Sequence, residues 1–151
     1  MIDTIPLPAT DDPHDAPFWS AALRSQLVVQ SCDKCARLRF PPRPVCPYCQ
    51  STAHQWRVLS GAATVWSYAK PSSPLLPAFE ALTPYVVVLA QIDEDPSIRI
   101  IGNLVSPAGG GITGVDDSGL AIGAPLRVAF RQYAPDVALP CWTLLGDAVG
   151  E

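Results

Sequence analysis

The chain has 151 residues, a formal net charge of −4 and a mean hydropathy of +0.20. This length suits one domain, or a small module attached to a modest one, and is too short for a two-domain enzyme. A hydrophobic fraction of 48% against 16% charged residues excludes an intrinsically disordered chain. A pI near 5.0 argues against a protein that coats duplex nucleic acid, which normally needs a basic face. The 17 prolines predict strands and loops rather than long helices.

The first 16 residues are rich in proline and aspartate, and we expect them to form an arm without regular structure. They lack the basic start and apolar core of a secretory signal. The longest apolar run, residues 85–90, is far shorter than the roughly 20 residues that a membrane-spanning helix needs. The sequence therefore predicts a soluble, cytoplasmic protein without a membrane segment.

Residues 18–27 predict a short amphipathic helix. Trp19, Leu23 and Leu27 are spaced four apart and would share one face, and Pro17 suits the first turn of a helix. Phe18 and Trp19 need an apolar surface to cover them, which is either the protein's own core or another subunit. Phe18, Trp19 and Leu23 are accordingly candidate residues of a partner interface.

Two Cys-x-x-Cys pairs separated by ten residues are the strongest motif in the sequence. Each pair turns two thiolates to one side, so two facing pairs form a tetrahedral four-sulfur site that suits zinc. Iron uses the same ligand set, and redox dithiols or buried thiols are the alternatives without a metal. Four protein ligands leave no open coordination position, so the metal would be structural. The candidate ligands are Cys32, Cys35, Cys46 and Cys49.

The second half of the chain predicts five short β-strands. Val, Ile and Leu dominate them, and Gly, Pro and Asp lie between them. Most of the connections are too short for a crossover helix, which favours a small barrel over a parallel sheet. The two long connections, 71–84 and 106–119, are candidate binding loops, or simply flexible filler. The expected strands cover residues 61–70, 85–93, 98–105, 126–133 and 137–145.

Basic residues are concentrated in one interval of this acidic chain. Residues 34–79 hold six of the ten Lys and Arg residues and none of the 14 Asp and Glu residues. Such an interval can bind phosphate, or it can consist of ordinary solvated cations. The six basic residues are Lys34, Arg37, Arg39, Arg43, Arg57 and Lys70.

Outside the cysteine pairs, the sequence predicts no catalytic centre. Cys141 lies in an expected strand and is interpreted as a buried small hydrophobic residue. Neither histidine, His14 or His54, has a sequence context that would position it as a general base. The carboxylates at 93–95 and 116–117 lie in expected turns, and no phosphate-binding glycine motif occurs.

Several of these segments resemble one bacterial and archaeal family, first catalogued as a domain of unknown function, in which a rubredoxin-like zinc ribbon precedes an OB-fold. The resemblance covers nearly all of residues 17–145. It rests on the Pro-Phe-Trp start of the helix, the ribbon CDKCARLRFPPRPVCPYC, a strand with Gly61, Val65, Ser67 and Tyr68, and the segments Pro84-Tyr85-Val-Val and Gly102-Asn103-Leu-Val. The segment 39–43 is its most specific part.

The resemblance implies a mainly β protein in three parts. An N-terminal arm and short helix would occupy residues 1–27, and the rubredoxin-like zinc ribbon residues 28–58. A five-stranded OB-fold barrel would occupy residues 59–151.

The family resemblance also implies a function, that of a non-catalytic accessory subunit of a thiolase-superfamily acyl-CoA enzyme. The leading case is a lipid-transfer-protein-like aldolase that cleaves a steroid-type side chain by a retro-aldol reaction on an acyl-CoA. A thiolase, a hydroxymethylglutaryl-CoA synthase and a phloroglucinol-type acyltransferase are the alternatives. The assembly would be a heterotetramer with acyl-CoA at the shared site. Arg37, Arg39 and Arg43 are candidate contacts to the CoA phosphates, because guanidinium groups match phosphate oxygens.

Two other functions compete with this interpretation. An OB-fold beside a ribbon suits a single-stranded nucleic-acid-binding module, in which Trp66, Tyr68 and Tyr85 would stack on bases. The acidic composition argues against that module. An independent thioesterase or acyltransferase using Cys141 would need a base and an orienting group that the sequence does not indicate.

Overall fold

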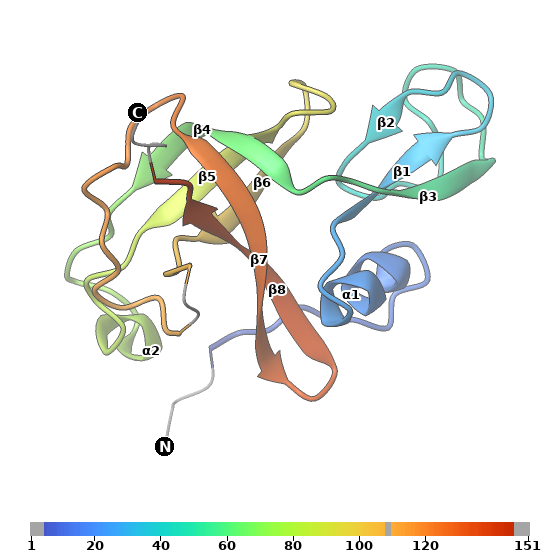
Figure 1. Ribbon diagram of the computed structural model, residues 1–151. Helices are drawn as coiled ribbons and strands as arrows, with labels where there is room; N and C mark the ends of the chain where they lie inside the picture. Colours follow the sequence, from blue (N-terminus) through green and yellow to red (C-terminus); the bar gives the residue numbers. More distant parts are fainter. Residues whose placement is uncertain (1–4, 108–109, 147–151) are drawn as a thin grey trace.

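The computed structural model describes residues 5–107 and 110–146. Strands dominate this part of the chain, which contains two short helices (Figure 1). In chain order the elements are α1 (Ala16–Leu23), β1 (Val28–Cys32), β2 (Leu38–Arg39), β3 (His54–Val58), β4 (Ala62–Ala69), α2 (Pro77–Glu80), β5 (Val87–Ile92), β6 (Arg99–Asn103), β7 (Pro125–Ala134) and β8 (Val137–Leu144).

The strands form two antiparallel sheets, which confirms the predicted mainly β fold. A three-stranded sheet of order β2-β1-β3 carries the cysteine pairs, and a five-stranded sheet has the order β6-β5-β4-β7-β8. A parallel bridge between Leu104 and Trp142 links the two ends of the larger sheet, so that it curls into a barrel. Figure 1 shows the small sheet at the right, the barrel at the left and α1 below the small sheet.

Alternating side chains explain how the barrel strands face the core. In β5, Val88, Ala90 and Ile92 point inward and are buried, while the residues between them are half-buried. Strand β4 alternates in the same way up to Val65, where its register with β5 shifts by one residue at Trp66. After this bulge the rest of β4 lies on the surface, which leaves Trp66 48% exposed.

The barrel closes where β6 passes close to β8. A Cβ atom on Gly102 would lie 2.6 Å from the Pro140 carbonyl oxygen and 3.1 Å from the Trp142 ring. The Trp142 side chain is fully buried and donates from Nε1 to the carbonyl oxygen of Ile100 at 3.2 Å. Only glycine fits at position 102 without a shift of these strands.

The helix is shorter than the predicted 18–27. It starts at Ala16, with a proline in its first turn, and ends at Leu23. Ser25 then adopts a left-handed conformation with φ 57°, which stops the helix and turns the chain into β1. Leu27 is buried, but it lies outside the helix.

The predicted apolar face of the helix is wrong. The buried residues of α1 are Phe18, Ala21 and Ala22, whereas Leu23 is 40% exposed. Phe18 packs on Trp19 and Phe40, with ring centroids 5.0 and 5.5 Å apart. Phe18 therefore belongs to the protein's own core, and this burial removes it from the candidate partner interface.

One hydrophobic core continues from the small sheet into the barrel. It includes Leu27 before β1, Val29 in β1, Leu38 in β2, and Val65 and Trp142 in the barrel. Since the two parts share these contacts, each stabilises the position of the other. The proposed boundaries of the three parts stay a prediction.

Both long connections are partly packed. Residues 71–84 contain α2, whose Phe79 lies 6.3 Å from Tyr85 between ring centroids. The 106–119 connection buries Ile112 in the same small cluster. Among the described residues, no helix is long and apolar enough to span a membrane.

Candidate metal centre and the cavities beside it

The four paired cysteines converge at one end of the small sheet. The Sγ atoms of Cys32 and Cys49 are 3.5 Å apart, those of Cys35 and Cys46 are 3.7 Å apart, and all four lie within 4.8 Å of one another. Zinc bound to four sulfurs at about 2.3 Å would place them roughly 3.8 Å apart. The arrangement therefore fits a tetrahedral metal ion.

Both cysteine pairs have the same backbone geometry. In the first, the N–H of Ala36 donates to the Cys32 carbonyl oxygen at 2.9 Å, and in the second the N–H of Gln50 donates to the Cys46 carbonyl oxygen at 2.9 Å. Ala36 and Gln50 each adopt a left-handed φ, of 59° and 62°. No local signal in the sequence predicts these turns, because neither position carries the glycine that usually marks them.

The pKa values of the thiols in this cluster differ from one another. Burial alone would raise the pKa of Cys46, but the N–H groups of Tyr48 and Cys49 outweigh it and lower this pKa to about 6. The N–H of Ser51 lowers the pKa of Cys49, yet burial and the neighbouring thiols raise it to about 11. A bound divalent cation would favour the deprotonated form of all four thiols.

The three candidate phosphate contacts do not lie on one surface. Arg37 is exposed and stacks over the Tyr48 ring, with its guanidinium carbon 4.4 Å from the ring centroid. Arg43 is also exposed, whereas Arg39 is buried at 4% exposure. The basic interval is thus divided between the surface and the interior.

Gln30 organises the buried arginine Arg39, and no sequence motif predicts this contact. Its Oε1 accepts from Arg39 Nε at 2.7 Å and from the backbone N–H of Arg43 at 2.8 Å. Its amide nitrogen lies 3.2 Å from Nε2 of His54. Gln30 opposes Arg39 across the β1–β2 ladder, so a polar pair is buried between these two strands.

A cavity of about 260 Å³ separates the small sheet from the turn between β5 and β6. Polar and apolar residues line it in similar measure. They are Leu38, Arg39, Phe40, Arg43, Pro47, Tyr48, Ser97 and Ile98.

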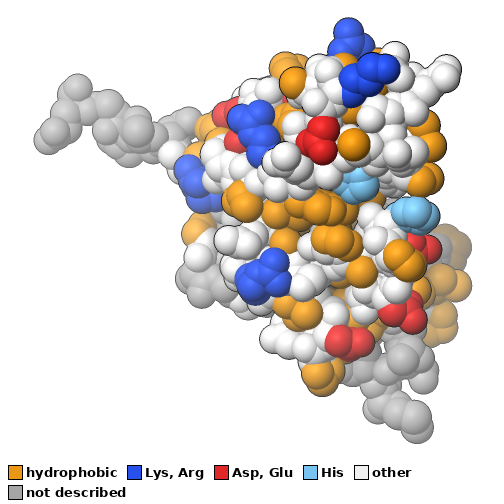
Figure 2. All heavy atoms as spheres, turned by 90° about the vertical axis from the view of Figure 1, so that its right-hand side faces the viewer, with side chains coloured by type: hydrophobic (Ala, Val, Ile, Leu, Met, Phe, Trp, Pro, Cys, Tyr) orange, Lys and Arg blue, Asp and Glu red, His pale blue; other side chains and the backbone are white. Residues whose placement is uncertain are grey.

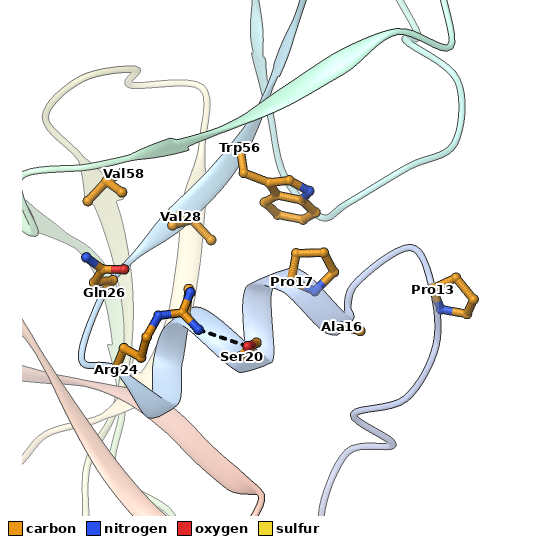
Figure 3. A pocket seen from close by; sticks show the side chains of 10 residues that line it. Pro13, Ala16, Pro17, Ser20, Arg24, Gln26, Val28, Trp56 and Val58 are labelled. Atoms are coloured by element: carbon orange, nitrogen blue, oxygen red, sulfur yellow. Dashed lines mark hydrogen bonds between the residues drawn. The ribbon is translucent and has the colours of Figure 1, made fainter.

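A larger open groove of about 620 Å³ runs between α1 and the strands β1 and β3. Figure 3 shows Trp56 above Pro17 and the side chain of Arg24 along the helix, where its Nη1 donates to Ser20 Oγ at 2.9 Å. Figure 2 shows a band of hydrophobic side chains across this face, with Lys and Arg mostly in the upper half, over the small sheet.

A third, mostly apolar cavity of about 370 Å³ lies on the other side of α1. Phe18, Trp19 and Phe40 border it on one side, and residues of α2, β6 and β8 border it on the other. Leu23 lines neither this cavity nor the groove of Figure 3.

Cys141 borders the same apolar cavity and is not an activated nucleophile. Burial raises the pKa of its thiol to about 11, which disfavours the thiolate. The thiol lies 3.7 Å from the Leu139 carbonyl oxygen, as a donor to it.

The aromatic residues suggested for base stacking are not free to act together. Tyr85 is 8% exposed and packs against Phe79. The guanidinium of Arg99 covers Trp66 at 3.7 Å from the ring centroid. Of the three, Tyr68 alone keeps an exposed ring without such a cover among the described residues.

Comparison with known proteins gives two family matches. Residues 19–55 match the ChsH2 rubredoxin-like zinc ribbon domain, and residues 56–131 match the ChsH2 C-terminal OB-fold domain. Together with the four-thiol cluster, the first match shows that the cofactor of this chain is a structural metal ion, zinc.

Three similar proteins place these matches in context. A probable enoyl-CoA hydratase alpha subunit of Thermomonospora curvata is 36% identical over 89% of this chain and 38% of its own length. The 3-oxo-4,17-pregnadiene-20-carboxyl-CoA hydratase alpha subunit of Mycobacterium tuberculosis is 29% identical over 83% of this chain and 36% of its own length. A solved structure titled Ltp2-ChsH2(DUF35) aldolase is 31% identical, with a TM-score of 0.75, and covers 91% of this chain and 98% of that one.

The chain thus spans little more than a third of the two curated relatives, but almost all of the solved chain. The family matches, the order of ribbon and barrel and the solved structure agree with one another. The chain belongs to the ChsH2 family, in which a rubredoxin-like zinc ribbon is followed by an OB-fold domain.

Proposed function

We propose that this chain is a non-catalytic, zinc-binding accessory subunit of a thiolase-like acyl-CoA enzyme, in the first place an aldolase that cleaves a steroid-type side chain. The observation that carries the proposal is the likeness, along nearly the whole chain, to a structure titled Ltp2-ChsH2(DUF35) aldolase. The name of the mycobacterial relative, a pregnadiene-carboxyl-CoA hydratase subunit, supports a steroid-derived acyl-CoA as the substrate class.

The accessory role agrees with the chemistry of the described residues. The zinc-ribbon thiols would fill every coordination position of the metal, so it would have none left for a substrate. His54 is occupied by contacts to Gln30 and to the Thr52 carbonyl oxygen, and Cys141 is kept protonated by burial. We assign Cys32, Cys35, Cys46 and Cys49 as the zinc ligands.

The catalytic subunit would dock beside α1. Trp19 borders the apolar cavity, and Leu23, four residues later in α1, is exposed, so both offer apolar area to a partner. The CoA moiety would lie at the shared site, with Arg37, Arg39 and Arg43 directed to its phosphates. A heterotetramer with two copies of each subunit follows if the catalytic subunit is dimeric.

Co-expression with a thiolase-like protein from the same organism tests the proposal. We expect the two chains to co-elute in size-exclusion chromatography, and retro-aldol turnover of an acyl-CoA to require the mixture. Activity with a thiolase, synthase or acyltransferase substrate instead would keep the accessory role and reassign the reaction. A chain that neither co-elutes nor changes turnover would contradict it.

A matched pair of variants locates the interface. Leu23→Asp places a charge on the proposed docking side of α1, whereas Ile122→Asp places one at an even more exposed apolar residue in the turn before β7. We expect Leu23→Asp to abolish co-elution and Ile122→Asp to preserve it. The reverse result would move the docking surface to the barrel.

A further inference from the structure

The buried guanidinium of Arg39 has donors that nothing in the described chain satisfies. Its Nε donates to Gln30, but Nη1 and Nη2 are shielded from water and have no hydrogen-bond partner. These two nitrogens carry four N–H groups and a delocalised positive charge. A desolvated cation with unmatched donors is strongly unfavourable, so this arrangement calls for an acceptor.

The chain's own carboxylates do not provide that acceptor. No Asp or Glu occurs between Asp33 and Glu80 in the sequence. Within the described ranges, Lys70 and Asp117 form the only ion pair. The missing partner of Arg39 must therefore come from outside the described residues.

The cavity between the zinc ribbon and the β5–β6 turn gives such a group a place beside Arg39. Arg43 and Tyr48 line it from the ribbon, and Ser97 lines it from the barrel. Arg43 adds a second, exposed cation. The carboxylate of Asp95 lies at the barrel side, where it already accepts the N–H and hydroxyl of Ser97 at 2.9 and 2.7 Å.

Gln30 holds the two arginines in fixed relation. The Nδ1 atom of His54 lies 3.0 Å from the Thr52 carbonyl oxygen, which only accepts, so Nδ1 carries the proton. The Nε2 atom of His54 then accepts from the amide nitrogen of Gln30 at 3.2 Å. This contact fixes the amide orientation and turns Oε1 toward Arg39 and the backbone of Arg43.

We propose that this cavity is an oxyanion site for one phosphoryl or carboxylate group. Nη1 and Nη2 of Arg39 would be the paired donors, Arg43 the second cation and Gln30 the positioning residue. The planar guanidinium fork matches two oxygens of either group. The inference deepens the proposed function, which directs Arg39 and Arg43 to CoA, but it concerns binding by the isolated zinc-loaded chain.

Nuclear magnetic resonance of the arginine Nε–H groups tests the site directly. We would titrate the zinc-loaded chain with inorganic phosphate and, separately, with acetate, each at ionic strength held constant with chloride. A saturable shift of the Arg39 Nε–H resonance is expected with at least one of them. Stronger binding of phosphate identifies a phosphoryl site, and stronger binding of acetate a carboxylate site. A response to neither overturns the inference.

Variants separate the site from general attraction by positive charge. Arg43→Gln should weaken binding about tenfold, equivalent to about 1.4 kcal/mol, and Arg57→Gln, at an exposed arginine of β3 that does not line the cavity, should leave it unchanged. Arg39→Gln should abolish binding. Equal losses in Arg57→Gln and Arg43→Gln would show attraction by surface charge alone and contradict the site.

Gln30→Glu keeps the inference testable if Arg39→Gln does not fold. The isosteric carboxylate would face Arg39 Nε and neutralise the cation internally, so anion binding should fall at least about tenfold while zinc content and the circular dichroism spectrum stay unchanged. Undiminished binding in this folded variant would overturn the inference. Since no partner is present, the result is independent of whether the catalytic subunit co-elutes.

Discussion

The zinc ribbon and the barrel reach a defined structure by different means. The ribbon is a small sheet, one strand of which has only two residues, and it holds four thiols at one end. The barrel instead buries many Val, Ile and Leu side chains around Trp142. A small sheet cannot bury enough apolar surface alone, so a metal and a shared core must supply the remainder. The ribbon therefore depends on ligand chemistry and the barrel on packing, although one core joins them.

Removal of a zinc ligand should have the largest effect. Cys46→Ser leaves three thiolates, and structural zinc in comparable small motifs contributes about 10–16 kcal/mol. We expect loss of zinc and unfolding of β1–β3, measured by zinc content and amide hydrogen exchange. Cys141→Ser, at the cysteine outside the cluster, is the control and should retain zinc. A zinc-free Cys46→Ser variant with a protected ribbon would refute the dependence on metal.

The second-largest loss of stability is expected from a large cavity in the barrel. Trp142→Ala removes a fully buried indole and should lower the free energy of unfolding by about 3–5 kcal/mol. Trp66→Ala, at a tryptophan on the outer face, should cost less than about 1 kcal/mol. Urea denaturation of both variants measures the difference. Similar losses would mean that the barrel is not stabilised chiefly by its interior.

A methyl group added where the barrel closes tests the packing of the barrel a second time. Gly102→Ala brings a Cβ within 2.6 Å of the Pro140 carbonyl oxygen and should cost about 1–3 kcal/mol. Gly119→Ala has no atom within 4 Å of the added Cβ and should cost about 0.5 kcal/mol or less. Thermal unfolding distinguishes them. A Gly102→Ala variant as stable as Gly119→Ala would show that β6 and β8 can separate freely.

The smallest effect is expected where the two regions are joined. Burial would raise the pKa of Glu94, but the N–H and hydroxyl of Ser60, in the linker from β3 to β4, outweigh it and lower this pKa. A lowered folded-state pKa stabilises the fold at neutral pH, and this contribution is lost as the pH falls through that pKa. Glu94→Gln should therefore be slightly less stable than wild type at pH 7 and equal to it in acid. A constant difference from pH 7 to pH 3 would exclude this linkage.

The sequence predicted the parts of the fold that depend on local pattern. Two Cys-x-x-Cys pairs fix the ribbon by their spacing, and the five expected strands were found within a few residues because apolar alternation marks them. The helix was predicted too long because Ser25, an ordinary residue in sequence, takes a left-handed turn.

The interior of the ribbon could not be predicted in the same way. From the sequence alone, Arg39 would be expected on the surface. Its burial depends on Gln30, which faces it from β1, and on the β5–β6 turn of the barrel, which lines the cavity beside it. Phe18, beside Trp19, could equally face a partner or the core in the sequence, and only the packed structure shows that the core covers it. In both cases the decisive neighbours are distant in sequence, where no local pattern reports them.

The four tryptophans lie in four different surroundings, which gives the molecule a built-in set of fluorescent reporters. Trp142 is enclosed in the barrel, Trp66 is stacked beneath Arg99, Trp56 lies at the groove of Figure 3, and Trp19 borders the apolar cavity. Variants that each retain a single tryptophan would report by their fluorescence on each of these surroundings separately. Quenching of emission by an added subunit in the chain that keeps Trp19, with unchanged emission in the chain that keeps Trp142, would then distinguish docking from unfolding.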